Sequence, residues 1–229
     1  MKEIKLSDLD FEKGEVFLFD KPYEWTSFDV VKKVRNRLRI KKVGHAGTLD
    51  PLATGLLIVC AGKATKKINE FQDMGKEYTG TLVLGKTTPS VDLETEFDSE
   101  NDASHITSSQ VEEVAKSLTG DLMQVPPIYS AIKVDGERAY KMARRKEEAK
   151  LDPRPVKVSK FEVDCSNLPE VKFEIHCTKG TYIRSLVRDL GEALQCGAYM
   201  SSLCRTAIGH FRVEDAYNLE EFISSLQRD

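Results

Sequence analysis

The sequence predicts an α+β fold built around a sizeable hydrophobic core. Segments with apolar residues at every second position and segments with apolar residues at helical spacing follow one another without a regular strand-helix-strand rhythm, which argues against a doubly wound parallel sheet. The chain has 229 residues, of which 40% are hydrophobic and 31% are charged. This length and composition are typical of one large domain, or of two small ones that share a core.

The first predicted elements are a strand and a helix. Glu15–Asp20 is apolar and aromatic enough for a short strand, and the turn signal Lys21-Pro22 ends it. Thr26 or Ser27 can cap the helix that follows. The apolar residues of this helix recur at helical spacing and predict its buried side: Val30, Val31, Val34 and Leu38.

A glycine-rich loop is expected after this helix. Gly44–Gly55 contains three glycines and one proline, and the glycines permit a close approach of the backbone to a ligand. Leu56–Cys60 is short and apolar enough for a buried strand.

The rest of the chain mixes helices and strands. Helices are expected over Lys63–Gln72, Gln110–Leu118, Ala139–Lys150, Tyr182–Leu194 and Leu219–Leu226. Strands are expected over Glu77–Leu84, Val156–Val163 and Val171–Cys177, the last of which alternates apolar and polar residues. The polar and acidic segment Thr87–Ser104 is expected to be a loop.

Composition argues against several kinds of protein and site. The longest apolar run, Leu56–Ala61, is far below the roughly 18 residues of a membrane span, and no signal peptide is visible. The five cysteines show no C-x-x-C spacing and predict free, mostly buried thiols, while the four histidines do not pair at zinc-ligand spacing. We therefore expect a cytoplasmic protein without metal, cofactor or membrane contact, and a monomer without an implied protein partner.

The charge is unevenly distributed, although the net charge is only -3. Residues 31–67 contain ten basic residues and one acid, and residues 131–160 contain ten basic residues and five acids. Between them, residues 91–113 contain eight acids and no base. Two basic segments can present a basic face to phosphates. Solvated helix faces are the alternative explanation.

Asp50 is the one acid of the first basic segment. Surrounding cations favour the ionised carboxylate by lowering its pKa, which suits a nucleophile or a general base next to an anionic ligand. The alternative is a turn or capping aspartate, because Asp-Pro is a common turn starter.

The segment around Asp50 carries one long motif, Lys42-Val43-Gly44-His45-Ala46-Gly47-Thr48-Leu49-Asp50-Pro51-Leu52-Ala53-Thr54-Gly55. It resembles the TruB family of tRNA pseudouridine synthases, and the resemblance extends over about Val16 to Phe222. Further matching segments are Gly62–Lys66, Lys76–Tyr78, Pro127–Lys133, His176–Ser185 and Asp189–Gly191. The resemblance implies a single catalytic domain over residues 1–229, built on a large mixed, mainly antiparallel sheet flanked by helices. The C-terminal PUA domain of many bacterial relatives is expected to be absent.

This family isomerises uridine-55 in the TΨC loop of tRNA to pseudouridine, and its members flip the nucleotide out of the loop. The resemblance implies that Asp50 is the catalytic carboxylate, that Tyr78 stacks on the target base and that Arg184 is the ion-pair partner of Asp50. Leu203 resembles the apolar residue near the base, and His45 the histidine that supports the flipped nucleotide. The other implied substrate-binding residues are Lys21, Lys66, Asp92 and Tyr182.

Several alternatives remain open at this point. Asp50 can attack C1′ of the ribose, add to C6 of the base or remove the 2′ proton. Tyr78 can be a core aromatic, and Arg184 a surface residue paired with Asp189. A tRNA-binding chaperone without catalysis and a synthase acting on another RNA are the competing functions.

Three positions depart from the family pattern. Glu24 stands where the first motif has a glycine, which predicts a different turn there. Ala46 replaces a threonine, and Cys204 stands where a basic residue is common, which removes an expected phosphate contact.

Overall fold

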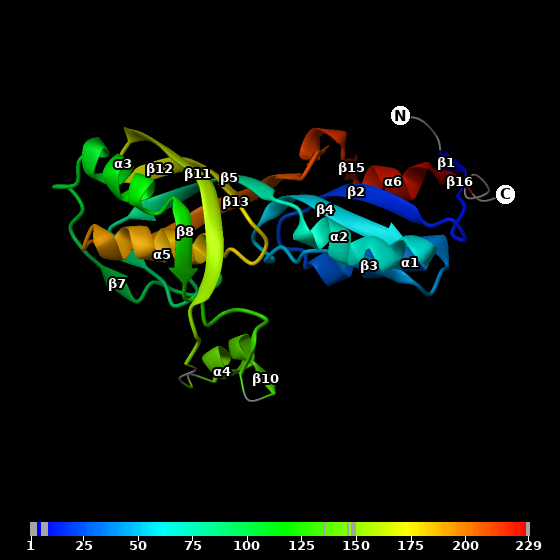
Figure 1. The fold of residues 1–229 in the computed structure, drawn as a ribbon, viewed down its shortest axis with the longest axis horizontal. Coiled ribbons are helices and arrows are strands. Elements are labelled where there is room, and N and C mark those ends of the chain that lie inside the picture. Colours follow the sequence, from blue (N-terminus) through cyan, green and yellow to red (C-terminus); the bar gives the residue numbers. More distant parts are fainter. Residues whose placement is uncertain (1–3, 6–8, 135, 146, 148–149, 228–229) are drawn as a thin grey trace. The chain divides into compact units, whose positions relative to one another are not determined.

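The computed structural model describes residues 4–5, 9–134, 136–145, 147 and 150–227 of the chain, which divides into two compact units (Figure 1). The first unit contains residues 1–78 and 203–229, and the second contains residues 79–202. Strands β5 (Lys76–Leu84) and β13 (Ala198–Ile208) contribute residues to both. Each unit contains strands and helices of its own.

The first unit contains a mixed sheet with the strand order β15-β2-β4-β13. Strand β2 (Glu15–Lys21) runs antiparallel to β4 (Thr54–Ala61), whereas β15 (Tyr217–Asn218) is parallel to β2 and β13 is parallel to β4. Two more strands pair antiparallel at this sheet, β3 (Val43–Ala46) with β4 and β14 (Phe211–Arg212) with β13. Strands β1 (Ile4–Lys5) and β16 (Leu226–Gln227) form a separate parallel pair.

Helices cover both faces of this sheet. Leu57 and Val59 of β4 pack in one core cluster with α1 (Ser27–Leu38) and α6 (Leu219–Ser225). Leu56 and Ile58 pack in the opposite cluster with the 3₁₀ helix η2 (Gly62–Lys67) and α2 (Ile68–Asp73). Because successive residues of a strand point to opposite faces, β4 is buried on both sides, which explains its unbroken apolar run. A second 3₁₀ helix, η3, spans Val213–Asp215.

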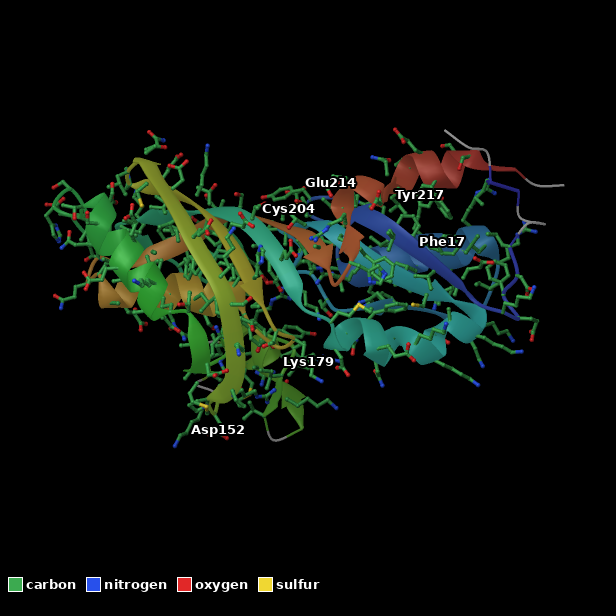
Figure 2. All side chains as sticks on the ribbon, turned by 45° about the horizontal axis from the view of Figure 1, so that its top comes forward. Phe17, Asp152, Lys179, Cys204, Glu214 and Tyr217 are labelled. Carbon is green, nitrogen blue, oxygen red and sulfur yellow. The ribbon has the colours of Figure 1, made fainter. Side chains whose placement is uncertain are left out.

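Two sequence predictions for this unit are confirmed in detail. Thr26 caps α1 and forms a capping box with Asp29, and the four predicted apolar residues of α1 are buried. Aromatic rings pack α6 against β2 and β15: the centroid of the Phe222 ring lies 5.2 Å from that of Phe17 on β2 and 5.3 Å from that of Tyr217 on β15. Phe17 and Tyr217 are labelled in Figure 2.

In the second unit the strand order is β13-β5-β12-β11-β8. The long strand β11 (Arg154–Asn167) runs antiparallel to both β12 (Glu170–Cys177) and β8 (Gly120–Gln124). Helices α3 (Ser108–Ser117) and α5 (Ile183–Ala193) contact each other, and α3 also contacts β11. A small hairpin, β9 (Lys133–Val134) and β10 (Glu137–Arg138), precedes α4 (Ala139–Arg144), and β6 (Lys86–Thr87) pairs with β7 (Ser99–Glu100).

The predicted fold class is confirmed: the chain is α+β, with a mixed, mainly antiparallel sheet and flanking helices. Three local predictions are wrong. The start of the expected loop Gly44–Gly55 is strand β3, because its backbone pairs with β4. The basic helix ends at Arg144 and not at Lys150, although residues 146 and 148–149 lie outside the described part. The expected loop Thr87–Ser104 contains strand β7, which pairs with β6. Strand β13 had no corresponding prediction. No helix in the described ranges is long and apolar enough to cross a bilayer.

Candidate active site

Asp50 lies in the loop between β3 and β4, the segment Gly47–Ala53, which we call the Asp50 loop. The residue is half-buried, and its carbonyl oxygen accepts a hydrogen bond from the nitrogen of Ala53 over 3.1 Å. Asp50 therefore begins a turn, as the alternative interpretation of this residue predicts. Because the turn uses the backbone carbonyl of Asp50, its carboxylate remains available for a chemical role.

Ser27 holds the residue before Asp50. Its buried hydroxyl accepts a hydrogen bond from the nitrogen of Leu49 over 2.9 Å and donates one to the carbonyl oxygen of Leu49 over 3.3 Å. Ser27 is available for this because Thr26, and not Ser27, caps α1. Ser27, the first residue of α1, thus fixes the backbone of Leu49 directly before Asp50.

Lys21 holds the residue after Asp50. Its fully buried ammonium group donates to three carbonyl oxygens, those of Pro22 at 2.8 Å, Trp25 at 2.6 Å and Pro51 at 3.1 Å. An ammonium group has three donors, so this set uses all of them. Burial lowers the pKa of Lys21 to about 8, and the nearby carboxylate of Asp50 is the strongest opposing influence. The geometry therefore gives Lys21 a supporting position under the loop rather than one on an open surface.

Arg205 on β13 braces the start of the same loop. The side chain is 1% exposed, and its guanidinium donates to the carbonyl oxygens of Leu56 at 2.8 Å, Thr48 at 3.4 Å and Gly47 at 3.1 Å. The sequence patterns did not single out this residue. The available signal was an arginine in phase with the inward-facing Leu203 and Ala207 of one strand.

Two glycines of the motif, Gly44 and Gly55, are needed for packing within the chain, while the expected close approach to a ligand stays a prediction. A Cβ atom at Gly55 would lie 2.4 Å from the carbonyl oxygen of Arg205, and φ is +100° there. A Cβ atom at Gly44 would lie 2.8 Å from Cδ1 of Ile68. Gly55 also donates its N–H to Asp20 over 3.0 Å, so β2 and β13 both approach its backbone.

His45 and Lys66 lie in the same unit but in different surroundings. His45 is half-buried on β3, and burial lowers its pKa, with a smaller opposing effect from the Gly47 backbone. Its Nδ1 atom is buried without a hydrogen-bond partner in the part of the chain that the structure describes. Lys66 is exposed on η2. The neutral ring and the exposed cation are therefore available for different kinds of contact.

Tyr78 and Leu203 are buried residues on the neighbouring strands β5 and β13. Both belong to the first unit, as Asp50 does. Their burial fits an apolar slot for a base and fits a core aromatic equally well, so their implied role stays a prediction.

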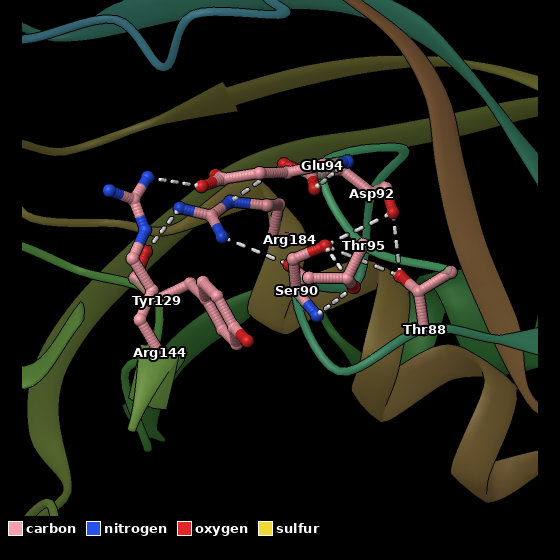
Figure 3. A network of polar contacts seen from close by, with 8 residues as sticks. All are labelled: Thr88, Ser90, Asp92, Glu94, Thr95, Tyr129, Arg144 and Arg184. Atoms are coloured by element: carbon pink, nitrogen blue, oxygen red, sulfur yellow. Dashed lines mark hydrogen bonds and ion pairs between the residues drawn. The ribbon is translucent and has the colours of Figure 1, made fainter. Parts of the chain in front are cut away.

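In the second unit, Arg184 and Asp92 form a buried ion pair (Figure 3). Nε of Arg184 lies 3.6 Å from Oδ2 of Asp92, and the two side chains are 3% and 4% exposed. The guanidinium also donates to the carbonyl oxygens of Ser90 at 2.9 Å and Tyr129 at 2.8 Å. The suggestion of a surface arginine paired with Asp189 is wrong, because Arg188 makes that pair.

The loop that carries Asp92 is tied down by its own hydroxyl groups. Thr88 and Ser90 donate to the carbonyl oxygen of Asp92 over 2.6 Å and 3.1 Å, and Oδ1 of Asp92 accepts from the nitrogen of Glu94 over 3.0 Å. Glu94 in turn pairs with Arg144 over 2.9 Å. Figure 3 shows these groups as one connected network. Asp92, an expected substrate-binding residue, is thus a structural partner of Arg184.

Tyr182 stands at the N-terminus of α5, where the side chain of Gln124 pairs with its backbone. The amide oxygen of Gln124 accepts from the nitrogen of Tyr182 over 2.8 Å, and its Nε2 donates to the carbonyl oxygen of Tyr182 over 3.1 Å. Arg184 therefore sits in the first turn of a helix that is anchored to β8.

The two basic segments differ in how their charges are used. In the second, Arg144, Arg145 and Lys160 are each paired with glutamates. In the first, several cations are exposed, and no ion pair involves them within the described residues: Lys32, Arg39, Lys41, Lys42, Lys66 and Lys67. The second segment also keeps exposed cations outside these pairs, so both segments carry uncompensated positive charge among the described residues.

The mixed sheet and the motif loop that it supports place this chain in the class of pseudouridine synthases, which are isomerases. The chain belongs to the TruB family. Residues 35–183 match the family model described as "TruB family pseudouridylate synthase (N terminal domain)", and residues 184–228 match "tRNA pseudouridylate synthase B C-terminal domain".

Curated relatives are similar over almost their whole length. A protein of Phocaeicola vulgatus named tRNA pseudouridine synthase B is 51% identical over 93% of this chain and 94% of the relative. Proteins of the same name from Parabacteroides distasonis and Flavobacterium johnsoniae are 48% and 47% identical, over 96% and 95% of this chain and 97% and 98% of theirs.

Solved structures agree on the fold. A chain of a Cbf5-Nop10-Gar1 complex matches with a TM-score of 0.72 and 32% identity, over 93% of this chain and 54% of the solved one. A chain of an H/ACA RNP bound to a substrate RNA containing 2'-deoxyuridine matches with a TM-score of 0.69 and 28% identity, over 93% of this chain and 53% of the solved one. This chain thus spans about half the length of these solved chains.

Proposed function

We propose that this chain isomerises uridine-55 in the TΨC loop of tRNA to pseudouridine, with Asp50 as the catalytic carboxylate. The observation that carries the proposal is the bracing of the Asp50 loop. Ser27 holds the residue before Asp50, Lys21 the residue after it, and Arg205 the start of the loop. Such fixed positioning is what a reacting carboxylate requires, since small displacements of a catalytic group cost large factors in rate.

The names of the curated relatives support tRNA as the substrate. In the reaction, the bond from N1 of uracil to C1′ of ribose breaks and a bond from C5 to C1′ forms. The C5 proton leaves to solvent and N1 gains a proton, so no electrons are exchanged with another reactant. A carboxylate that assists departure of the base therefore suffices.

The other site residues have supporting roles in this proposal. Tyr78 and Leu203 hold the face of the loosened uracil in an apolar slot after the nucleotide is flipped out, while His45 supports the flipped nucleotide. Arg184 keeps Asp50 ionised. Burial and two carbonyl contacts give its guanidinium a fixed orientation.

Three further residues complete the proposed site. Lys66 is an exposed cation available to phosphate, and Tyr182 lines the site at the start of α5. Asp92 acts through Arg184. In the same proposal, both units belong to one catalytic domain that acts on the T-arm of tRNA as a cytoplasmic monomer.

The test is the substitution Asp50→Asn, assayed by release of tritium from tRNA labelled at C5 of uridine. We expect activity to fall by at least about 10³-fold with tRNA binding largely kept, because only the reacting group changes. Appreciable turnover by this variant would refute the proposed role of Asp50. Wild-type protein that refolds tRNA without releasing tritium would instead be the non-catalytic chaperone.

A bare T-arm stem-loop tests the substrate. We expect modification of the single uridine at position 55, and none when this uridine is replaced by cytidine. Modification of another RNA in preference to the stem-loop would favour the synthase with a different substrate.

A further inference from the structure

One face of α1 carries Phe28, Lys32 and Arg35, and Arg39 follows as the C-cap residue of the helix; we call these four side chains the α1 stripe. The first three stand at positions i, i+4 and i+7, which lie above one another on a helix, whereas Arg39 has a left-handed backbone directly after the last helical residue, Leu38. Phe28 is 58% exposed, Lys32 and Arg39 are exposed, and Arg35 is half-buried. An exposed aromatic ring thus begins a row of three cations.

The cations on the adjacent face of α1 serve the fold, whereas those of the α1 stripe do not. Lys33 lies 3.5 Å from Glu220, and Arg37 donates to the carbonyl oxygens of Ile223 and Leu226. Across the described residues no ion pair involves Lys32, Arg35 or Arg39. The structure therefore leaves the charge of the stripe available to a ligand.

The α1 stripe costs stability in the free protein. Lys32 and Arg35 are like charges one helical turn apart, and such a pair is unfavourable by about 0.2–0.5 kcal/mol. Arg39 also has φ at +55°, a conformation that favours glycine or asparagine. A polyanionic ligand would offset these costs.

The end of α1 adds a shallow hollow without an acid. It is lined by Arg35, Asn36, Arg39, Ile40 and Lys41. The nearest acids of the stripe, Glu24 and Asp29, lie at its other end, and the Asp29 carboxylate is engaged by Thr26. Six residues of helix separate Lys32 from the helix end at Leu38, which is roughly 9 Å along the axis.

We propose that the α1 stripe binds the phosphodiester backbone of the RNA substrate, with Phe28 stacking on an unpaired base. The combination of exposed aromatic and cationic side chains is the usual one for nucleic-acid surfaces, because phosphates are neutralised while a ring accepts the face of any base. The identity of the RNA rests on the proposed function. The surface itself rests on α1 alone.

The test is a triple variant, Lys32→Gln, Arg35→Gln and Arg39→Gln, in the full chain. Its dissociation constant for tRNA is measured by fluorescence anisotropy between about 50 and about 200 mM salt, because released counterions set the salt dependence. If three phosphate contacts are lost, the slope of log K against log salt should become shallower by about 2 to 3. The variant should unfold at the same or a higher temperature, since a like-charge pair is removed.

A matched triple variant controls for total charge. Lys13, Lys116 and Lys172 are exposed cations outside both basic segments, and their replacement by glutamine changes the net charge equally. The control should keep the wild-type slope. Equal slopes for the two triple variants would overturn the proposal, as would wild-type affinity of the α1 variant for tRNA.

Phe28 is tested separately by Phe28→Ala and Phe28→Leu. Loss of one stacked base should weaken tRNA binding by at least about fivefold in Phe28→Ala, and leucine should not restore it. These are binding measurements, so they stand if Asp50→Asn proves active, whereas failure of the stripe leaves the proposed chemistry intact.

Discussion

The ammonium group of Lys21 donates a hydrogen bond to the carbonyl oxygen of Pro51, the residue that follows Asp50, over 3.1 Å. Lys21 ends β2, so the first strand of the sheet reaches directly under the Asp50 loop. The same ammonium group also raises the positive potential at the carboxylate of Asp50. The end of β2 thus places a positive charge near the carboxylate of Asp50.

The first prediction uses the pKa of Lys21, which burial lowers from its ordinary value of 10.5 to about 8. Between these two pH values the unfolded chain binds more protons at this residue than the folded chain does. The free energy of unfolding of the wild type should therefore rise with pH relative to that of Lys21→Met, by about 3 kcal/mol in total. Below about pH 8 the difference should be constant. Urea unfolding of both proteins across this window measures it, and parallel curves would contradict the assigned pKa.

The second prediction concerns Glu24, which stands where the motif of the resembled family was expected to have a glycine. Its φ is +64°, so this glutamate adopts the left-handed conformation that glycine prefers, and the expected difference of the turn stays a prediction. Glu24→Gly should stabilise the protein by about 1 kcal/mol, because the steric cost of the left-handed conformation is relieved. Thermal unfolding measures this. Glu12→Gly, at an ordinary exposed position, should not stabilise the protein.

The fold class was predictable because hydrophobic spacing survives in most elements. The helix from Ser27 and the strand around Leu56–Cys60 follow from local patterns alone, since each is both locally favoured and buried. Strand β3 was not predictable, because its glycine and histidine have weak strand preference and its pairing with β4 decides the conformation. The basic helix was overestimated because Arg145, directly after its last residue, pairs with Glu137 of the neighbouring hairpin instead of extending the helix.

The candidate site was predictable only for residues inside contiguous motifs. Asp50 stood out by charge and motif, but the contacts that brace its loop come from β2, α1 and β13, which are distant in sequence. Tertiary hydrogen bonds to carbonyl oxygens leave no local pattern. Arg205 was therefore missed, although it holds the same loop as Lys21.

The third prediction separates two causes of destabilisation at Gly55: the left-handed backbone conformation and the clash of an added Cβ atom with β13. An alanine there would need φ near +100° and would place Cβ 2.4 Å from the carbonyl oxygen of Arg205. Gly120 has φ at +97°, and a Cβ atom there would meet nothing within 4 Å among the described residues, so Gly120→Ala carries the conformational cost alone. We expect about 1–2 kcal/mol of destabilisation for Gly120→Ala and clearly more for Gly55→Ala. Equal losses would show that the approach of β13 to Gly55 is not tight.

The fourth prediction addresses the buried pair of Arg184 and Asp92. Removal of one partner, as in Asp92→Ala, should destabilise the protein by about 3–5 kcal/mol, because the other charge stays buried. In a double-mutant cycle with Arg184→Met, the second substitution should recover part of this loss. The control is the pair of Arg188 and Asp189, whose side chains are 26% and 30% exposed and whose coupling should be below about 1 kcal/mol. Similar coupling in the two cycles would argue against a buried pair.

The last prediction is that Arg205 positions the Asp50 loop for catalysis. Arg205→Lys keeps the charge, but an ammonium group cannot reproduce the planar set of contacts to Leu56, Thr48 and Gly47. A displacement of the loop by about 1 Å should lower kcat by about 10²-fold, while KM for tRNA changes little, since the buried side chain offers no surface for binding. Arg212→Lys is the matched control, because Arg212 pairs with Glu77 at the surface of the same unit and should keep its kcat. A merely structural role of Arg205 would lower the unfolding temperature without changing kcat of the folded fraction, so the two measurements on one preparation decide between positioning and stability alone.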